Sequence, residues 1–500
     1  MRESASNRNA AQAVKRIRDA VRERPGDAHA RYALGVALVR LGRVDEAEET
    51  FREAVRLRPG WAEAHNALGA VLCRLRRYSE AIERLSFAAG LREDFALPRH
   101  NLGMALAAAG RLSEAADAFR RAAALSPGLP EPRVNLAETL DRLGRHPEAA
   151  AAWREVTRMR PDLAGAHARS GWARCRIGEY REAAEDFRAA LRLDPSRLEA
   201  LSGLGWACSE TGDLEEAAQA FRRESELSPR DPLPLYNLGT VLGRLGRYEE
   251  AARRLEESAE REGKHAETRY NLGVCLFRLR RHGKAAEAFR EALRIRPSWP
   301  KGRYNLGVAL LETGRNEEAA QAFREVVREM PNHTRARFNL GRSFLLLGRE
   351  REAVESFREA ASRDPDHAAS RFALGALLLR QGRNGEAADA FREAIRARPG
   401  EARAHNGLGV ALLRMARPAE AAEAFREAVR ISPSYAGAHF NLGLCLLRPE
   451  DREAASRQLT VLSFLDPSLA RRYTALLHRH GGKGPDRPFA RAVIASREPG

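Results

Sequence analysis

A pattern of apolar and small residues returns every 34 residues along almost the whole chain. In its ninth copy, Leu306, Leu310 and Leu311 have the spacing of one helix face, which predicts a helix over about 301–312. Gly314 follows, and glycine adopts the left-handed backbone at a helix C-terminus at little cost. The first half of each copy is therefore expected to form one short amphipathic helix.

The second half of the same copy predicts a second helix, over about 317–329. Pro331 ends it, because the proline ring clashes with a continuing helix. Gly307 and Ala319 are expected to let the two helices approach closely, with Phe323 filling the space between them. A single hairpin of this kind cannot bury its apolar faces alone, so its stability has to come from stacking on its neighbours.

Thirteen such repeats follow one another without an insertion. Their first residues are 28, 62, 96, 130, 164, 198, 232, 266, 300, 334, 368, 402 and 436. We predict a polar segment with a half-repeat helix over 1–27, the repeats over 28–469, a capping helix over 470–480 and a disordered tail over 481–500.

The N-terminal segment has the pattern of the second helix of an incomplete repeat. Ala13, Ile17 and Ala20 are expected to form its apolar face, and Pro25 to end it. The first residues are polar and lack the apolar run of a signal peptide. No window of the chain approaches 18 apolar residues, so we predict no membrane span.

The pattern resembles the tetratricopeptide repeat family. The family motif is matched in the ninth repeat by Leu306, Gly307, Ala319, Phe323, Val326 and Pro331. The resemblance covers roughly residues 9–479. It implies an all-α fold, a right-handed α-solenoid superhelix of stacked helix-turn-helix repeats, whose concave face carries first-helix residues and takes up peptides. The early Trp of the family is replaced by Arg or His, as at Arg303, Arg337 and His439, and an aromatic residue follows.

Seven repeats place Asn immediately before the Leu-Gly pair, and we call these residues the asparagine column. They are Asn101, Asn135, Asn237, Asn271, Asn305, Asn339 and Asn441. An amide offers both donors and an acceptor, which suits it to holding a peptide backbone. The repeats are similar to the repeat region of O-linked N-acetylglucosamine transferases, without their catalytic domain, and there such a column lines the groove. Alternatively, Asn is simply the commonest consensus residue at this position.

Arginine recurs seven residues after the column positions, which is about two helical turns and the same helix face. The members that we predict to bind peptide are Arg142, Arg176, Arg244, Arg278 and Arg380. Arg40, Arg74, Arg414 and Arg448 share the position. The planar guanidinium grips carboxylates in a bidentate manner, which favours acidic protein segments as ligands. In chaperone-binding members of the family, a second basic residue precedes the Asn. Here that residue is Tyr236, Tyr270 or Tyr304, so we do not expect a chaperone-tail clamp.

The fifth and sixth repeats depart most from the pattern. Trp172 and Trp206 follow the central Gly, at positions that face the groove by family analogy. Gly203 replaces the column Asn, and Glu224 occupies a position of the packed face that is normally Ala. Exposed aromatic residues are typical anchors for a partner, so the two tryptophans are candidates for a local binding pocket. Alternatively, they are buried between repeats.

Charge and cysteine content narrow the function classes. The formal net charge is +17, nearly all of the basic residues are Arg, and basic residues alternate with acidic ones instead of forming blocks. No specific nucleic-acid motif is present. Opposite charges three residues apart, such as Glu287 with Arg290 and Asp389 with Arg392, predict solvated pairs on the outer face. The odd number of cysteines, 5, without a C-x-x-C pair, indicates a cytoplasmic protein with reduced thiols.

The repeats leave no residues over for an enzyme active site, so we predict a non-catalytic scaffold with no cofactor and no metal. Its partner is expected to be a protein or peptide, with acidic segments preferred. An accessory or assembly role, positioning a separate enzyme such as a glycosyltransferase or belonging to an envelope or secretion complex, stays open. So does the formation of oligomers.

Overall fold

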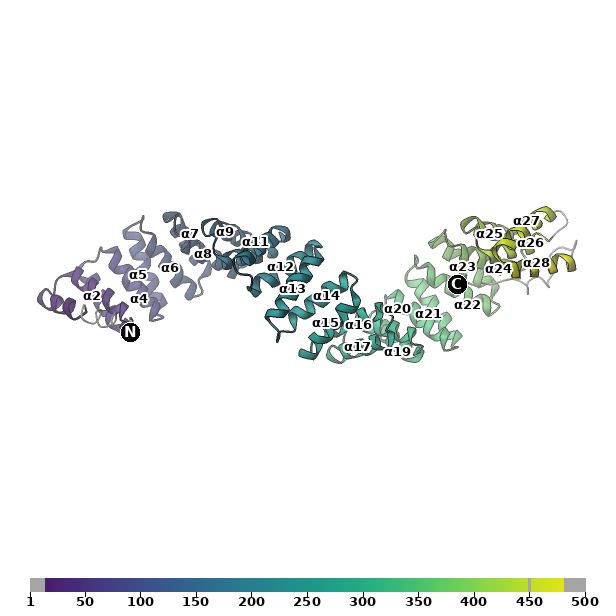
Figure 1. Cartoon of the computed structure of the whole chain (residues 1–500), viewed down its shortest axis with the longest axis horizontal. Coiled ribbons are helices and arrows are strands. Elements are labelled where there is room, and N and C mark those ends of the chain that lie inside the picture. The colour runs from purple at the N-terminus through teal and green to yellow at the C-terminus, as the bar shows by residue number, and fades with distance from the viewer. Residues whose placement is uncertain (1–13, 448–450, 481–500) are drawn as a thin grey trace. The chain divides into compact units, whose positions relative to one another are not determined.

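The computed structural model describes residues 14–447 and 451–480, and over these residues the secondary structure is entirely helical (Figure 1). The start of the polar segment (1–13) and the predicted disordered tail (481–500) lie outside the described residues, as does Arg448. The chain divides into two compact units, Met1–Arg261 and Glu262–Gly500. The first compact unit begins with a helical segment at 14–23.

The helices follow in pairs. Those of the first compact unit are α2 Ala28–Arg40, α3 Val44–Leu57, α4 Ala62–Arg74, α5 Tyr78–Leu91, α6 Ala96–Ala108, α7 Leu112–Leu125, α8 Glu131–Arg142, α9 His146–Met159, α10 Ala164–Arg176, α11 Tyr180–Leu193, α12 Leu198–Thr211, α13 Leu214–Leu227, α14 Leu233–Arg244 and α15 Tyr248–Arg261. Those of the second are α16 Ala266–Arg278, α17 His282–Ile295, α18 Pro300–Glu312, α19 Asn316–Glu329, α20 Thr334–Leu346, α21 Glu350–Arg363, α22 Ala368–Arg380, α23 Asn384–Ala397, α24 Ala402–Arg414, α25 Pro418–Ile431, α26 Ala436–Cys445, α27 Arg452–Leu465 and α28 Pro467–His480.

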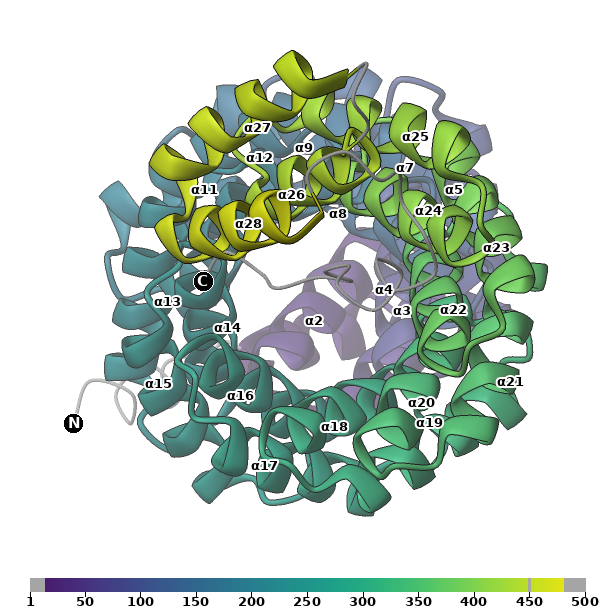
Figure 2. The same ribbon diagram turned by 90° about the vertical axis from the view of Figure 1, so that its right-hand side faces the viewer.

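Within each compact unit, every helix packs against the next one along the chain, which is the arrangement of an α-solenoid. In the second compact unit, Figure 2 shows α16, α18, α20, α22 and α24 on the inner side of the stack, with α17, α19, α21, α23 and α25 outside them. The first helices of the repeats therefore supply the inner face. The prediction of an all-α solenoid is confirmed.

The close approach predicted at Gly307 is also confirmed. A Cβ atom added at Gly307 would lie only 2.7 Å from Cε1 of Phe323, whose side chain is fully buried. Glycine at this position is thus required by the ring of the second helix. Gly314 adopts a φ of 73°, as expected of a helix C-terminus. Ala416 stands at the equivalent position of a later repeat and still adopts a φ of 58°, so the fold imposes this turn.

The Arg that replaces the early Trp of the family has a structural role. The Arg303 side chain is 14% exposed, and its Nε lies 2.8 Å from Glu325 Oε2 on the second helix. Its Nη2 donates to the carbonyl oxygen of Pro297 at 2.7 Å, which closes the loop between repeats. The same ion pair recurs as Arg31–Glu53, Arg133–Glu155, Arg269–Glu291, Arg337–Glu359 and Arg371–Glu393.

Histidine serves the same loop where it replaces Arg. His65 Nε2 donates to the carbonyl of Pro59 at 2.8 Å, and His439 Nε2 donates to that of Pro433 at 2.8 Å. Both residues close the inter-repeat loop through a proline carbonyl six residues earlier. The departure from the family motif is therefore a replacement of apolar packing by a polar clamp.

This clamp gives a testable difference between substitutions. Arg303→Leu is expected to lower the free energy of unfolding by about 1 kcal/mol, because the charged hydrogen bond to the Pro297 carbonyl is lost. Arg303→His should cost less, since imidazole can still reach Pro297 as His439 reaches Pro433. Urea unfolding of the full chain, followed by circular dichroism, measures both. Equal costs for Leu and His would contradict the role of the loop carbonyl.

The outer charged residues pair both within one helix and between repeats. The predicted pair of Asp389 with Arg392 is present at 2.8 Å. Arg290, however, donates to Glu318 of the next repeat at 2.8 Å. Helix stacking brings these second-helix positions together, so the three-residue spacing alone does not identify the partner of Arg290.

The two ends of the solenoid complete its core in different ways. In the segment 14–23, Val14 is buried and Ile17 and Val21 pack against the first core, whereas Ala20 is exposed. The prediction that Ala20 belongs to the apolar face of this helix is therefore wrong, whereas the prediction for Ile17 is confirmed. The predicted Ala13 lies outside the described residues. At the other end, Tyr473 of α28 is fully buried and its hydroxyl donates to the carbonyl of Gly443 at 3.0 Å. The last helix thus fills the space beside the last central glycine.

Candidate functional site

The asparagine column links successive repeats. In five of its members, Nδ2 contacts the side chain that lies 35 residues earlier, at the position just before the column in the preceding repeat. The contacts are Asn101 to Asn66 Oδ1 (2.8 Å), Asn135 to His100 Nε2 (3.5 Å), Asn305 to Tyr270 Oη (2.7 Å), Asn339 to Tyr304 Oη (3.1 Å) and Asn441 to Asn406 Oδ1 (3.0 Å). Tyr270 and Tyr304, two of the tyrosines that replace the chaperone-clamp residue, are therefore acceptors for this column.

In Asn305 this contact uses one of the two N–H donors of the amide, so the second donor and the carbonyl oxygen remain for another ligand. In Asn339 the carbonyl oxygen also accepts a hydrogen bond from Nη1 of Arg342 at 3.3 Å. Accessibility differs along the column. Asn441 is fully buried and Asn339 is 7% exposed, whereas Asn101, Asn237 and Asn305 are half-buried. Asn135 and Asn271 are half-buried too. The half-buried members are the ones that a surface ligand can reach.

The predicted arginines end the first helices and are exposed. They are Arg142 on α8, Arg176 on α10, Arg244 on α14, Arg278 on α16 and Arg380 on α22. Two of them contact a carboxylate: Arg176 Nη1 lies 3.6 Å from Asp141 Oδ1, and Arg380 Nη2 lies 2.6 Å from Glu350 Oε1. Arg380 and Glu350 are both exposed, so their pair competes only weakly with a ligand carboxylate, whereas the Asp141 side chain is 17% exposed.

One cavity brings a column Asn and a predicted Arg together. It has a volume of about 300 Å³ and is lined by Asn305, Arg278, Phe277 and Phe289, with Val274 and Val308. Burial raises the pKa of Tyr270, and the hydrogen bond from Asn305 partly opposes this rise. Tyr270 therefore remains neutral and holds the Asn305 amide beside the cavity.

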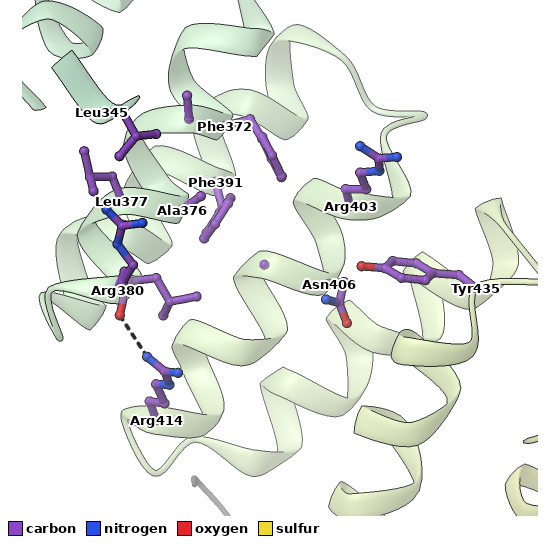
Figure 3. Close-up of a pocket in the computed structure, with 13 residues that line it drawn as sticks. Leu345, Phe372, Ala376, Leu377, Arg380, Phe391, Arg403, Asn406, Arg414 and Tyr435 are labelled. Carbon is purple, nitrogen blue, oxygen red and sulfur yellow. Dashed lines mark hydrogen bonds between the residues drawn. The ribbon is translucent and has the colours of Figure 1, made fainter. Parts of the chain in front are cut away.

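A second, larger cavity of about 410 Å³ lies over α20, α22 and α24 (Figure 3). Its lining includes the predicted Arg380, and also Phe372, Phe391, Arg403 and Tyr435, which sequence reasoning did not select. The sequence feature that could have indicated this cavity is an interruption of the asparagine column. The column position is Ala373 in the eleventh repeat and Gly407 in the twelfth.

The two predicted tryptophans lie together in the first compact unit. Their ring centroids are 5.5 Å apart, and Trp206 is 39% exposed. Trp172 is half-buried, donates from Nε1 to the carbonyl of Glu199 at 3.2 Å, and packs edge-on against Phe187. Trp172 thus joins the stack between repeats, while Trp206 offers an exposed aromatic surface. Neither ring is fully buried, and a binding pocket at these tryptophans stays a prediction.

The break in the column at Gly203 has a steric cause. A Cβ atom added there would lie 2.2 Å from Cζ of Phe187. Nearby, the hydroxyl of Ser202 donates to Oε1 of Glu224, whose side chain is buried. Oε2 of Glu224 has no hydrogen-bond partner, and burial raises the pKa of this carboxyl.

In the part of the chain that the structure describes, no group of three or more His, Cys, Asp or Glu residues could hold a metal ion. Over the same residues, none of the helices combines the length and the apolar character that crossing a bilayer requires.

Comparison with protein families identifies the repeats. A family model described as "Tetratricopeptide repeat" matches residues 5–62, 66–130, 169–232, 236–300, 304–368, 338–402, 372–436 and 406–459. A second model with the same description matches residues 106–170. The chain belongs to the tetratricopeptide repeat family. Its architecture is that of a protein-interaction scaffold. No curated protein matches this tetratricopeptide repeat chain.

Several solved structures are similar to it. One is "MamA 41-end from Desulfovibrio magneticus RS-1", with 27% identity over 34% of this chain and 97% of that chain, at a TM-score of 0.33. Another is YrrB, described as "a TPR protein with an unusual peptide-binding site", with 24% identity over 36% of this chain and 94% of that chain, at a TM-score of 0.34. The complex "Naa15/Naa10 bound to HypK-THB" includes a chain with 14% identity, covering 91% of this chain and 78% of that chain, at a TM-score of 0.41.

Proposed function

We propose that this tetratricopeptide repeat protein is a non-catalytic scaffold that binds an extended, acidic protein segment on the inner face of its first helices. The observation that carries the proposal is the cavity where Asn305 and Arg278 lie together among phenylalanine rings. Amide groups suit the ligand backbone, and guanidinium groups suit its carboxylates. The aromatic rings supply apolar contact area for the side chains between them.

The hydrogen bonds between repeats support this role because they position the column before a ligand arrives. Asn305 is held by Tyr270, and Asn339 is held by Tyr304. Side chains that are already ordered lose less conformational entropy on binding than mobile ones. The column is therefore both a link between repeats and a pre-oriented row of amides.

The thiols support a reducing compartment, which we propose to be the cytoplasm. Among the described residues, the five cysteines form no disulfide. Burial raises the pKa of the Cys175 thiol to about 12 and that of Cys275 to about 11. Thiols of this kind are unreactive packing residues.

Two matched variants test the binding role of the column. Asn305→Ala removes the amide of a half-buried member, whereas Tyr270→Phe removes only its inter-repeat hydrogen bond. A labelled twelve-residue peptide of alternating Asp and Ser, with blocked ends, is the probe. We expect the asparagine variant to weaken binding about tenfold, equivalent to about 1.4 kcal/mol. The tyrosine variant should weaken binding less, and fluorescence anisotropy measures both.

A second peptide, in which Asn replaces every Asp, tests the preference for acidic segments. It should bind at least tenfold more weakly than the acidic peptide. Unchanged binding of the acidic peptide by the asparagine variant would overturn the role of the column. Equal binding of the two peptides would overturn the acidic preference.

A further inference from the structure

We propose that Trp206 and Glu210 of the sixth repeat bind one arginine side chain of a protein segment. Both residues lie on α12, the first helix of that repeat, within the first compact unit. Among residues 203–210 they are the two exposed residues. The inference goes beyond the proposed function, because this site takes a cation whereas the cavity at Asn305 suits a carboxylate.

The exposed indole of Trp206 is held by two other aromatic rings. Its ring centroid lies 5.5 Å from that of Trp172 and 6.3 Å from that of Tyr180, the first residue of α11. Trp206 is nevertheless 39% exposed. The face of an aromatic ring carries partial negative charge, and an indole attracts cations more strongly than the rings of Tyr and Phe. The exposed part of Trp206 is therefore an ordered surface that suits a cation.

Glu210 supplies a carboxylate beside this indole. It follows Trp206 by four residues, so the two side chains are neighbours on one face of the helix. The repeat pattern also places Glu210 near Tyr180. Arg380 and Glu350 occupy the same two positions in a later pair of repeats, and there Arg380 Nη2 lies 2.6 Å from Glu350 Oε1. The carboxylate and the aromatic rings therefore border one surface.

The charges around this surface are reversed relative to most repeats. The position of Glu210 is Arg in nine of the thirteen repeats. The residue just before the second helix is Arg in ten repeats, but it is Glu179 in the fifth repeat and Asp213 in the sixth. Arg176, which ends the first helix of the fifth repeat, lies 3.6 Å from Asp141 of the repeat before it. This part of the inner face thus carries negative charge where most repeats carry positive charge.

Two other partly exposed indoles of the chain are covered by arginine. The guanidinium carbon of Arg58 lies 5.6 Å from the ring centroid of Trp61, and that of Arg296 lies 4.9 Å from that of Trp299. Among the described residues, Trp206 contacts aromatic rings and not a cation. A guanidinium from a partner can therefore take on Trp206 the place that the chain's own arginines take on Trp61 and Trp299.

Ring and carboxylate together determine the ligand chemistry. A guanidinium is planar and weakly hydrated, so it stacks on an indole and grips a carboxylate with two N–H groups at once. An apolar side chain would cover Trp206 but would not pair with Glu210. An acidic side chain would be repelled by Glu210. Arginine is the side chain that satisfies both groups.

Three labelled peptides test the proposal on the full-length protein. Each is a blocked twelve-residue peptide of alternating Gly and Ser with Arg, Lys or citrulline at its centre. Citrulline has the shape of arginine without its charge. Fluorescence anisotropy is expected to show that the Arg peptide binds at least about fivefold more tightly than the citrulline peptide, and more tightly than the Lys peptide.

The order of these affinities is informative because the chain has a net charge of +17, which by itself would favour the neutral peptide. Equal binding of the Arg and citrulline peptides would overturn the proposal, as would a failure of the Arg peptide to bind. Equal binding of the Arg and Lys peptides would overturn the assignment of a guanidinium.

Variants of the carboxylate locate the site. Glu210→Gln is expected to reduce the advantage of Arg over citrulline by at least about threefold. Glu312→Gln removes the same charge from the same exposed position of the ninth repeat and should preserve the advantage. Equal reductions in the two variants would assign the effect to net charge and overturn the role of Glu210.

Variants of the indole test the ring. Trp206→Ala should remove the advantage of Arg over citrulline, whereas Met104→Ala, at the same exposed position of the third repeat, should preserve it. Preservation in both variants would overturn the role of Trp206. Circular dichroism checks the folding of both variants, and if Trp206→Ala lowers the helix content, the comparison of Glu210→Gln with Glu312→Gln decides.

The same variants separate this inference from the proposed function. Asn305→Ala should leave the binding of the Arg peptide unchanged, and Glu210→Gln should not weaken the binding of the acidic peptide. If the acidic peptide does not bind but the Arg peptide keeps its advantage, the proposed function fails and the arginine site stands. The opposite result leaves the proposed function standing and overturns the arginine site.

Discussion

Phe323→Ala is expected to lower the free energy of unfolding by about 3–5 kcal/mol, the usual cost of removing a buried phenylalanine ring. The Phe323 side chain is fully buried, and its ring lies so close to Gly307 that a Cβ atom there would meet it at 2.7 Å. The repeat cannot collapse around the missing ring, because the facing residue has no side chain to move into the space. Urea unfolding of the full chain measures the loss.

The loss should begin locally. In a repeat protein each repeat contacts mainly its neighbours, so a defect destabilises its own repeat and the two beside it first. Hydrogen exchange is therefore expected to show reduced protection in α18 and α19 before distant helices. The matched control is Phe464→Ala, because Phe464 is 85% exposed on α27 and its removal should change stability by less than about 0.5 kcal/mol. Equal effects of the two substitutions would contradict the packing role of Phe323.

The fold could be predicted closely because its determinants are local and repeated. The helices expected over 301–312 and 317–329 correspond to α18 and α19, which begin one residue earlier in each case. A helix face, a turn glycine and a proline all lie within one period, so each copy independently predicts the same pair of helices. The prediction for the half-repeat before α2 was less accurate, because this segment occurs only once in the chain. There, Val14 packs in the core while Ala20 is exposed.

The candidate site was only partly predictable, because its contacts join different helices. The hydrogen bond from Asn305 to Tyr270 spans 35 residues, and the ion pair of Arg303 with Glu325 joins the two helices of one repeat. A period shows that these positions recur, but it does not show which side chains meet. The period therefore predicts Asn305 as a ligand contact but does not identify Tyr270 as its structural partner.

The larger cavity illustrates a different limit. The cavity is lined by Ala373 and Gly407, which are smaller than the asparagine of the column, and by the ring of Phe391. A missing side chain in one sequence looks like ordinary variation. Only the packing shows that Phe391 requires glycine at 407 and that the space beside it remains open.

The second large expected effect is a gain of stability. Ser202→Ala combined with Glu224→Ala should raise the free energy of unfolding at pH 7.5 by about 2 kcal/mol, the typical cost of a buried polar group without its hydrogen bonds. The Glu224 side chain is 8% exposed, and its Oε2 atom has no partner. Alanine is the usual residue at this packed position, so the variant restores the pattern of the other repeats.

The gain should depend on pH in a defined direction. Burial raises the pKa of Glu224 in the folded protein, with the hydrogen bond from Ser202 opposing the rise and the charge of Asp231 adding to it. The protonated carboxyl therefore favours the folded state below the unfolded-state pKa, which is about 4.3 for Glu. This contribution is lost as the pH rises through the folded-state pKa, since the buried carboxyl must then ionise.

The variant lacks this group, so its advantage over the natural sequence should grow from pH 4.5 to pH 7.5. Urea unfolding at several pH values measures the difference. Ser202→Ala alone is the control, and it should lower stability because it removes the one hydrogen bond that the described residues make to the buried carboxyl. An advantage that is the same at every pH would show that the gain comes from packing alone. A loss of stability in the double variant would show that the Ser202–Glu224 pair stabilises this repeat, contrary to the cost inferred from its unpartnered oxygen.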